Sequence, residues 1–176
     1  VRFNYNNTYF QNARWQGLPL RGMNEIFKNL TKNPLIDIKY DTDYFQVKHQ
    51  YKFKERLIYT GPIDQFYEYK FNKLTWRSVK FDSEVVETTD FQGNSVVNFP
   101  SLNVDFTRIH EPQHLYPERK HLLDRSLIIK EYPDAVSERP YYPVRSSEDL
   151  EKYNQYVALS QKDDKVHIGG RLGNYA

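Results

Sequence analysis

Short segments in which apolar and polar side chains alternate run through the chain and predict β-strands. Residues 75–81 alternate over the longest stretch, and shorter segments cover residues 95–99, 107–110 and 126–130. A period of two residues is typical of a strand with one buried face. We therefore expect these four segments to form a largely antiparallel sheet in which the second and third are neighbours.

Further strands are predicted at residues 1–5, 36–40, 56–59 and 166–168. The third runs into Thr60-Gly61-Pro62, and the last runs into Gly169-Gly170. Glycine in such a turn permits close approach of the backbone to a ligand, although an ordinary turn explains the same residues. We expect no helix after Gly169-Gly170.

Three segments predict helices. Residues 23–30 place Met23, Ile26, Phe27 and Leu30 on one face. Residues 63–71 follow a proline that suits the start of a helix. Ser146, with Asp149 three residues later, resembles a capping box. The helix that follows is predicted to place Leu150, Tyr153 and Val157 on one face. Because helices are few and do not alternate with strands, the fold class is α+β with a largely antiparallel sheet.

The composition adds an unusual share of aromatic residues. The 176 residues include 15 Tyr and 11 Phe, and they form one domain or one piece of a larger one. Mean hydropathy is strongly negative, so many of the rings carry a polar tip and need not be buried. Such rings suit strands and also make platforms for sugars and nucleobases.

Charge and cysteine content exclude several classes of protein. The net charge is only +2, with both signs spread along the chain, which argues against a nucleic-acid or membrane-surface partner. No apolar run is long enough for a membrane span, and no signal peptide is visible. The absence of cysteine excludes disulfides and thiolate metal sites. Together these features favour a cytoplasmic protein.

Residues 110–114 match the zinc-protease pattern His-Glu-x-x-His in letters only. That site needs both histidines on one face of a continuous helix. Pro112 lies inside the motif, and proline in a helix interior costs about 3 kcal/mol. We therefore expect no metal.

Three polar residues in the strand region are candidate ligands. Arg108 follows Phe106 with strand spacing, which predicts that both side chains share a face, and guanidinium suits a diphosphate. Asn98 lies among apolar neighbours, and Tyr142 lies between two prolines that stiffen its loop. A solvated arginine, a satisfied core amide and a packed loop are the alternatives.

Six short blocks occur in an order and at separations that resemble the UDP-galactopyranose mutase family. The resemblance runs from residue 1 to residue 175. The blocks are Tyr-Thr-Gly-Pro-Ile-Asp at 59–64, Gln-Gly-Asn at 92–94, Thr-Arg-Ile at 107–109, Lys-Glu-Tyr-Pro at 130–133, Pro-Tyr-Tyr-Pro-Val at 140–144 and Gly-Gly-Arg-Leu at 169–172.

The resemblance implies a flavoenzyme that uses FAD to interconvert UDP-galactopyranose and UDP-galactofuranose for cell-surface polysaccharide. The family combines a Rossmann-like flavin domain, a helical domain and an antiparallel sheet domain. This chain resembles the sheet domain with interleaved flavin-domain elements. The family's G-x-G-x-x-G fingerprint is not among its 176 residues, so we expect residues 1–176 to be a fragment that is inactive alone.

The resemblance also assigns roles to particular residues. It implies substrate contacts at Arg108, Tyr142, Asn98, Tyr9 and Phe10, with UDP-galactose or UDP-galactofuranose as the partner. It implies flavin contacts at Arg171, Gly170, Thr60 and Gly61. A homodimer is compatible with it. The rival interpretations are a non-catalytic module that binds sugar nucleotides or glycans, and another flavoenzyme of the amine-oxidase kind.

Overall fold

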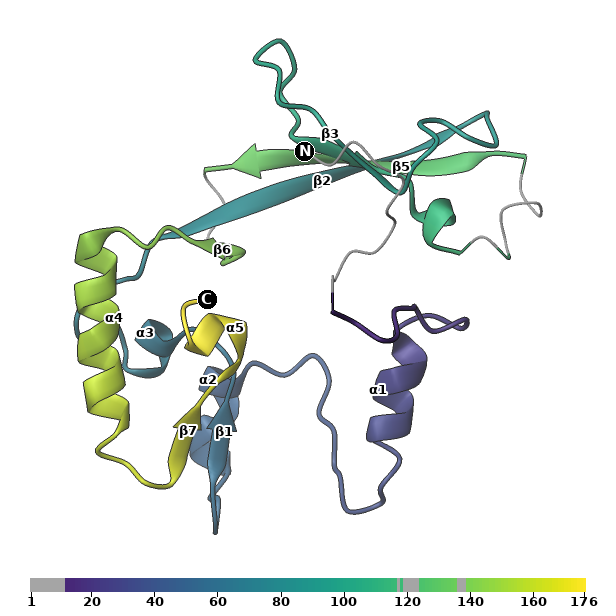
Figure 1. Cartoon of the computed structure of the whole chain (residues 1–176). Coiled ribbons are helices and arrows are strands. Elements are labelled where there is room, and N and C mark those ends of the chain that lie inside the picture. The colour runs from purple at the N-terminus through teal and green to yellow at the C-terminus, as the bar shows by residue number, and fades with distance from the viewer. Residues whose placement is uncertain (1–11, 117, 119–123, 136–138) are drawn as a thin grey trace.

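The computed structural model describes residues 12–116, 118, 124–135 and 139–176. An antiparallel sheet lies at the top of the view in Figure 1, with a smaller α/β part and an isolated helix below it. The strand predicted at residues 1–5 lies outside the described residues. The protein is thus of a mixed α/β class with sheets and few helices.

The larger sheet has five strands in the order β3-β4-β5-β2-β6, and every neighbouring pair is antiparallel. The four predicted strands of this sheet are confirmed. The two longest, β2 and β5, extend beyond the predicted segments because they pair along nine residues. The strands are β2 (Trp76–Val86), β3 (Val96–Asn98), β4 (Arg108–His110), β5 (Ser126–Asp134) and β6 (Tyr142–Pro143).

A second sheet consists of β1 (Leu57–Tyr59) and β7 (Val166–Ile168), which pair in parallel. Both strands were predicted. Three helices accompany this pair: α3 (Ile63–Phe66), α4 (Ser147–Ser160) and α5 (Gly170–Gly173). The prediction that nothing helical follows Gly169-Gly170 is wrong, because α5 begins at the second glycine.

Helix α3 is shorter than the predicted segment 63–71. Glu68 and Tyr69 have φ angles of 54° and 58°, and left-handed residues end a right-handed helix. The hydrogen bond from the N–H of Tyr69 to the carbonyl of Asp64 closes the turn that follows.

The core of the α/β part lies between α3, α4 and the C-terminal residues. The hydroxyl of Ser146 caps α4 by accepting from the N–H of Asp149 at 3.1 Å, as predicted. The predicted buried face is wrong in one respect. Leu150 is exposed, whereas Tyr156 is fully buried. The buried core consists of Ile63, Leu74, Tyr156 and Tyr175.

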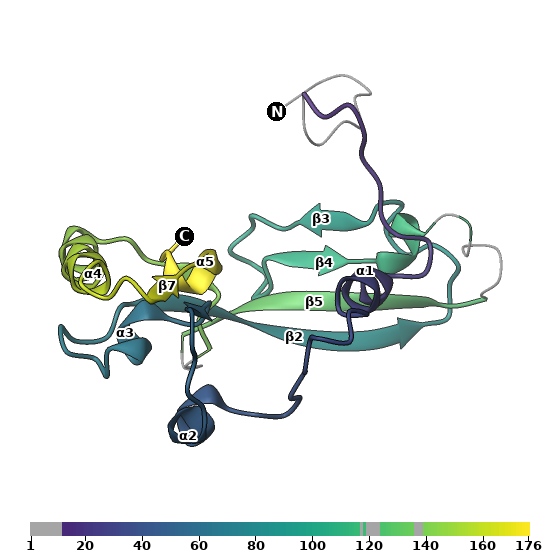
Figure 2. The same cartoon turned by 90° about the horizontal axis from the view of Figure 1, so that it is seen from below.

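Helix α1 (Asn24–Leu30) is confirmed, but it buries no residue. Seen from below, it lies in front of the sheet, on the same side as η2 (Pro112–Leu115) (Figure 2). Residues 36–40 form no strand, because no described segment pairs with them. Four further elements were not predicted: α2 (Tyr44–Val47), the 3-10 helices η1 (Lys48–Gln50) and η2, and the strand β6. The expectation that Tyr142 lies on a loop is wrong, because Tyr142 pairs with Arg77 of β2.

Candidate functional site

One row of residues crosses the five-stranded sheet at right angles to its strands. The register pairs Asn98 with Arg108, Arg108 with Glu131, and Glu131 with Phe81. Directly paired residues on neighbouring strands project from the same face of a sheet. The prediction that Asn98 and Arg108 lie on adjacent strands is therefore confirmed, and their side chains share a face.

Tyr142 lies on the same face as this row. The register pairs it with Arg77, which is four residues from Phe81 on β2, and residues an even number apart on a strand share a face. The neighbouring Tyr141 places its ring centroid 6.2 Å from that of Phe81. By register, Arg108, Asn98 and Tyr142 thus lie on one face of the sheet, although they are distant in sequence.

Phe106 corrects one expectation about that face. Its ring contacts Phe99 at 4.9 Å and Tyr132 at 6.1 Å between centroids. Both partners immediately follow members of the row, Asn98 and Glu131, and so point to the opposite face. Phe106 shares no face with Arg108, because β4 begins only at Arg108 and the alternation does not extend to the preceding loop.

Arg108 lies beside the buried carboxylate of Glu131 on the neighbouring strand. Its Nε lies 3.4 Å from Oε1 of Glu131, whose side chain is only 7% exposed, while the arginine side chain is 38% exposed. Nε is buried and forms no hydrogen bond. The terminal nitrogens of the guanidinium also form none with the described residues. This leaves donors on the open side of the sheet, where a bidentate anion contact could form.

Arg171 connects the small parallel sheet to this face. Its guanidinium carbon lies 5.7 Å from the centroid of the Tyr142 ring, in a cation–π arrangement. Its Nη1 donates a hydrogen bond to the carbonyl of Tyr141. A residue predicted to contact flavin is thereby in direct contact with one predicted to contact substrate.

The glycine turns that were predicted to bind cofactor lie side by side. Tyr59 and Ile168 are register partners at the carboxyl ends of β1 and β7, where ligands bind in open α/β sheets. The φ of Gly170 is +71°, and an added Cβ would lie 3.3 Å from Cβ of Thr60. Around Gly169 an added Cβ meets nothing within 4 Å. Packing inside the chain explains Gly61 and Gly170, because an added Cβ would meet Tyr59 and Thr60 there. The open space at Gly169 fits the close approach of a nucleotide cofactor, and Thr60, Gly61, Gly170 and Arg171 are the predicted residues beside it that could hold it.

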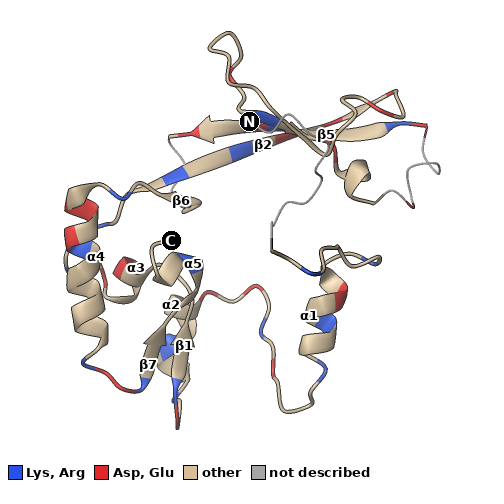
Figure 3. Cartoon of the chain, in the orientation of Figure 1, with Lys and Arg blue, Asp and Glu red and all other residues tan. Residues whose placement is uncertain are grey.

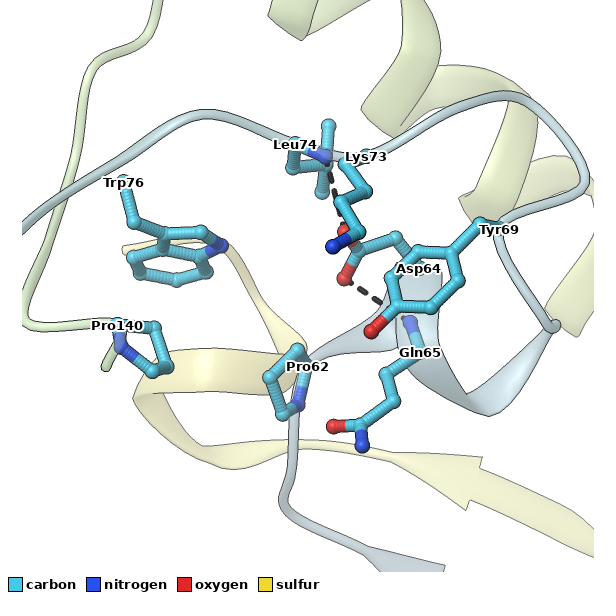
Figure 4. Close-up of a pocket in the computed structure, with 8 residues that line it drawn as sticks. All are labelled: Pro62, Asp64, Gln65, Tyr69, Lys73, Leu74, Trp76 and Pro140. Atoms are coloured by element: carbon cyan, nitrogen blue, oxygen red, sulfur yellow. Dashed lines mark hydrogen bonds between the residues drawn. The ribbon is translucent and has the colours of Figure 1, made fainter. Parts of the chain in front are cut away.

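A pocket of about 330 Å³ lies beside these turns (Figure 4). Asp64 in its wall is only 3% exposed, and its carboxylate accepts from the N–H groups of Gln65 at 3.0 Å and Leu74 at 2.9 Å. Because both oxygens stabilise the turn after β1, Asp64 has a structural role. The pocket is lined by Pro62, Asp64, Gln65, Tyr69, Lys73, Leu74, Trp76 and Pro140.

The His-Glu-x-x-His segment does not form one helix. His110 ends β4, and Pro112 begins η2. Glu111 is fully buried, and burial alone would raise its pKa. Hydrogen bonds from Ser126 and from the N–H groups of residues 91 and 92 outweigh that effect and hold the pKa below its usual value.

His114 lies 3.2 Å from both Glu111 and Asp90, so these three residues form the one cluster of metal-ligand type among the described residues. The carboxylate of Glu111 already accepts four hydrogen bonds, from Ser126, Gln113 and the two backbone N–H groups. We interpret the cluster as a support for the loop at residues 89–95, and the absence of a catalytic metal stays a prediction.

Charges of both signs are distributed over all parts of the described chain (Figure 3). No described helix has the length and apolar character that crossing a membrane requires. The predictions about nucleic acid, membrane surface and compartment stay predictions.

Two predicted site residues, Tyr9 and Phe10, lie outside the described residues. Two others were missed: Glu131, and His110 in its contact with Glu131, whose Oε2 lies 3.2 Å from Nε2 of the histidine. The alternating pattern that predicted β5 and β4 included both residues. Only the register between these two strands brings Glu131 and His110 together.

Comparisons with known proteins identify the family of the chain. A family model described as UDP-galactopyranose mutase matches residues 1–176. A probable UDP-galactopyranose mutase of Klebsiella pneumoniae is 32% identical over 178 residues, which cover 99% of this chain and 44% of the relative. The chain therefore spans less than half the length of that protein.

Two other relatives are similar over nearly the whole chain. A dTDP-fucopyranose mutase of Escherichia coli is 29% identical, with 99% of this chain and 47% of the relative covered. A UDP-galactopyranose mutase of Mycoplasma pneumoniae is 28% identical, with the same shares. Because the family model spans all 176 residues, the chain belongs to the UDP-galactopyranose mutase family.

Proposed function

We propose that the protein carrying this chain is an FAD-dependent isomerase that interconverts UDP-galactopyranose and UDP-galactofuranose. The observation that supports the proposal best is the contact between the predicted substrate residues and the predicted cofactor residues. Arg108, Asn98 and Tyr142 share one face of the sheet, and Arg171 joins that face to the glycine turns of the parallel sheet.

Arg108 is proposed to bind the diphosphate of the sugar nucleotide. Its terminal nitrogens can donate two parallel hydrogen bonds to phosphate oxygens, which suits the planar guanidinium group. As the bond between sugar and diphosphate breaks, negative charge grows on the leaving phosphate. A fixed cation beside it stabilises that charge more than it stabilises the ground state.

Tyr142 and Asn98 are proposed to orient the nucleotide and sugar. Both are exposed on the shared face, and neither the Asn98 amide nor the Tyr142 hydroxyl forms a hydrogen bond with the described residues. Tyr142 is stiffened by Pro143 and by the ring contact with Tyr141 at 6.5 Å. Ordered polar groups lose little conformational entropy when they bind.

The cofactor is proposed to lie at the carboxyl ends of β1 and β7. Thr60, Gly61 and Gly170 would bring backbone close to it, and Arg171 would lie between it and Tyr142. When bound, reduced flavin supplies the covalent chemistry at the anomeric carbon of the sugar. The residues of this chain hold the substrate over it and stabilise the diphosphate.

Arg108→Ala tests the proposal in the protein at its natural length and loaded with FAD. We expect kcat/KM for UDP-galactofuranose to fall by a factor of about 30 to 1000, corresponding to about 2–4 kcal/mol. The melting temperature should fall as well, because the buried Glu131 carboxylate loses the guanidinium beside it, and the kinetics are therefore measured below the unfolding transition of the variant. Arg125→Ala is the matched control, since Arg125 is a surface arginine that pairs, among the described residues, with its neighbour Asp124. Unchanged kinetics in Arg108→Ala would remove this residue from the site.

A dTDP-linked sugar is the second candidate substrate, because one relative is named for dTDP-fucopyranose. The same assay with UDP-galactose and dTDP-fucose side by side distinguishes the two. The proposal requires the larger kcat/KM for the uridine nucleotide.

A further inference from the structure

We propose that His110 is a positioning residue that takes up a proton when a diphosphate binds to Arg108. The inference rests on the proposed function to the extent that Arg108 receives the diphosphate. It assigns to His110 and Glu131 a role in coupling the affinity for the nucleotide to pH.

The geometry joins the three residues through a single carboxylate. Oε1 of Glu131 lies 3.4 Å from Nε of Arg108, and Oε2 lies 3.2 Å from Nε2 of His110. Arg108 and His110 are two residues apart on β4, so both side chains project from the same face. Glu131 lies opposite Arg108 on β5 and is therefore placed to contact both.

Burial makes this contact sensitive to charge. The Glu131 side chain is 7% exposed and that of His110 is 27% exposed, so the interactions between them are screened less than those of surface charges. The strongest competing contact of the carboxylate is a long one, from the Thr107 hydroxyl at 3.5 Å. A cation on each side is what stabilises a buried carboxylate best.

The other groups that face His110 carry no charge. On β2 its ring contacts Phe81 at 6.4 Å between centroids. Together with Ser83, Val96, Pro112, Leu115 and Ile129, it lines an apolar cavity of about 400 Å³. Among the described residues, the ionisable groups that face the imidazole are therefore Glu131 on β5 and Arg108 on its own strand.

The direction of the coupling follows from the charges. A diphosphate on Arg108 adds negative charge near the imidazole and competes with Glu131 for the guanidinium. Both effects favour the protonated imidazole over the neutral one. By linkage, a proton that is taken up on binding must also strengthen binding as the pH falls. The measurement therefore covers pH 5 to 8, about the range over which histidine side chains in general change their charge.

Titration calorimetry with UDP-galactose on the intact protein, with oxidised FAD, tests this. UDP-galactose is chosen because its diphosphate has no group that titrates between pH 5 and 8. Heats measured in buffers of different ionisation enthalpy give the number of protons taken up. We expect uptake of a fraction of a proton, and an affinity that falls as the pH rises, by no more than about tenfold per unit, the limit for one linked proton.

His110→Gln keeps a hydrogen-bond donor beside Glu131 but cannot take up a proton. In this variant we expect the proton uptake to vanish and the affinity to become independent of pH, while binding persists. His167→Gln is the matched control. His167 lies on β7, where Arg56 is its partner, and this variant should behave as wild type.

The outcomes separate the two proposals. Binding without proton uptake in the wild type, or unchanged uptake in His110→Gln, would overturn the role of His110 and leave the diphosphate site standing. Absence of UDP-galactose binding in the wild type would overturn both proposals. Loss of proton uptake in both His110→Gln and His167→Gln would point to a general change in the protein and would also overturn the role of His110. Glu131→Gln supplies a further check, because removing the shared carboxylate should reduce the uptake as well.

Discussion

At the scale of single residues, Gly170 is a backbone position where both the φ angle and a close neighbour disfavour a side chain. Its φ of +71° is unfavourable for other residues, and a Cβ would lie 3.3 Å from Thr60. We expect Gly170→Ala to lower the free energy of unfolding by about 1–2 kcal/mol. Denaturant titration measures this, and Gly17→Ala is the control because nothing lies within 4 Å of an added Cβ there. Equal effects of the two substitutions would contradict the role given to Gly170.

Glu111 makes a prediction about pH at the same scale. Its pKa is lowered in the folded state, because its hydrogen bonds favour the charged form despite burial. A group with a depressed folded-state pKa contributes stability that is present above its unfolded pKa and lost as the pH falls through the folded one. We therefore expect Glu111→Gln to lower the melting temperature at pH 7, by the equivalent of about 1–3 kcal/mol.

The difference between wild type and Glu111→Gln should shrink as the pH falls below about 4.5, where Glu111 takes up a proton in the unfolded chain, and should be lost once the folded protein is protonated too. Thermal unfolding followed by circular dichroism between pH 3 and pH 7 measures it. A difference that stays constant over this range would show that the charge of Glu111 is not what stabilises the loop.

At the scale of elements, α4 is anchored by one tyrosine hydroxyl. Tyr156 accepts from the N–H of Phe71 and donates to the carbonyl of Asn72, both at 2.9 Å. Tyr156→Phe leaves two buried backbone groups without partners, which should cost about 1–3 kcal/mol. Chemical denaturation provides the value. Tyr153→Phe on the same helix, whose hydroxyl has no such pair of bonds among the described residues, should cost clearly less.

At the scale of elements, sequence patterns predicted some strands and helices correctly and others wrongly. The segments at residues 75–81 and 107–110 became strands because their alternation is supported by partners on both sides. Residues 36–40 alternate equally well but remain without a partner strand, and a strand exists only through its hydrogen-bonded neighbour. Helix α1 formed as predicted, since helical hydrogen bonds are local, but its apolar residues Phe27 and Leu30 are exposed.

At the scale of the whole molecule, residues 1–176 span less than half of the relatives that they match. We expect the isolated chain neither to retain FAD nor to turn over UDP-galactofuranose, because it contains no G-x-G-x-x-G turn for the pyrophosphate. Visible absorbance after incubation with FAD and gel filtration measures retention. A purified chain that stays yellow, or turns over substrate under reducing conditions, would refute this expectation.

The sequence by itself determined most of the strands, helices α1, α3 and α4, and the pairing of β3 with β4. Asn98 and Arg108 could be placed on adjacent strands because the two strands follow one another in the chain, and consecutive strands usually pair. Tyr142 was identified through the prolines beside it and through the family resemblance. These properties depend on local backbone preferences and on short connections between elements, both of which can be inferred from the sequence.

Only the tertiary structure decided which side chains meet. Nothing in the sequence says that Glu131 lies opposite Arg108 and contacts His110, because a shift of one residue in the register would turn Glu131 to the other face. Phe106 was expected to share a face with Arg108 because the sequence did not show that β4 begins only at Arg108. The rotation of α4 about its axis placed Tyr156 rather than Leu150 in the core. Register and helix rotation are set by packing between distant segments, and that packing places the carboxylate that holds Arg108.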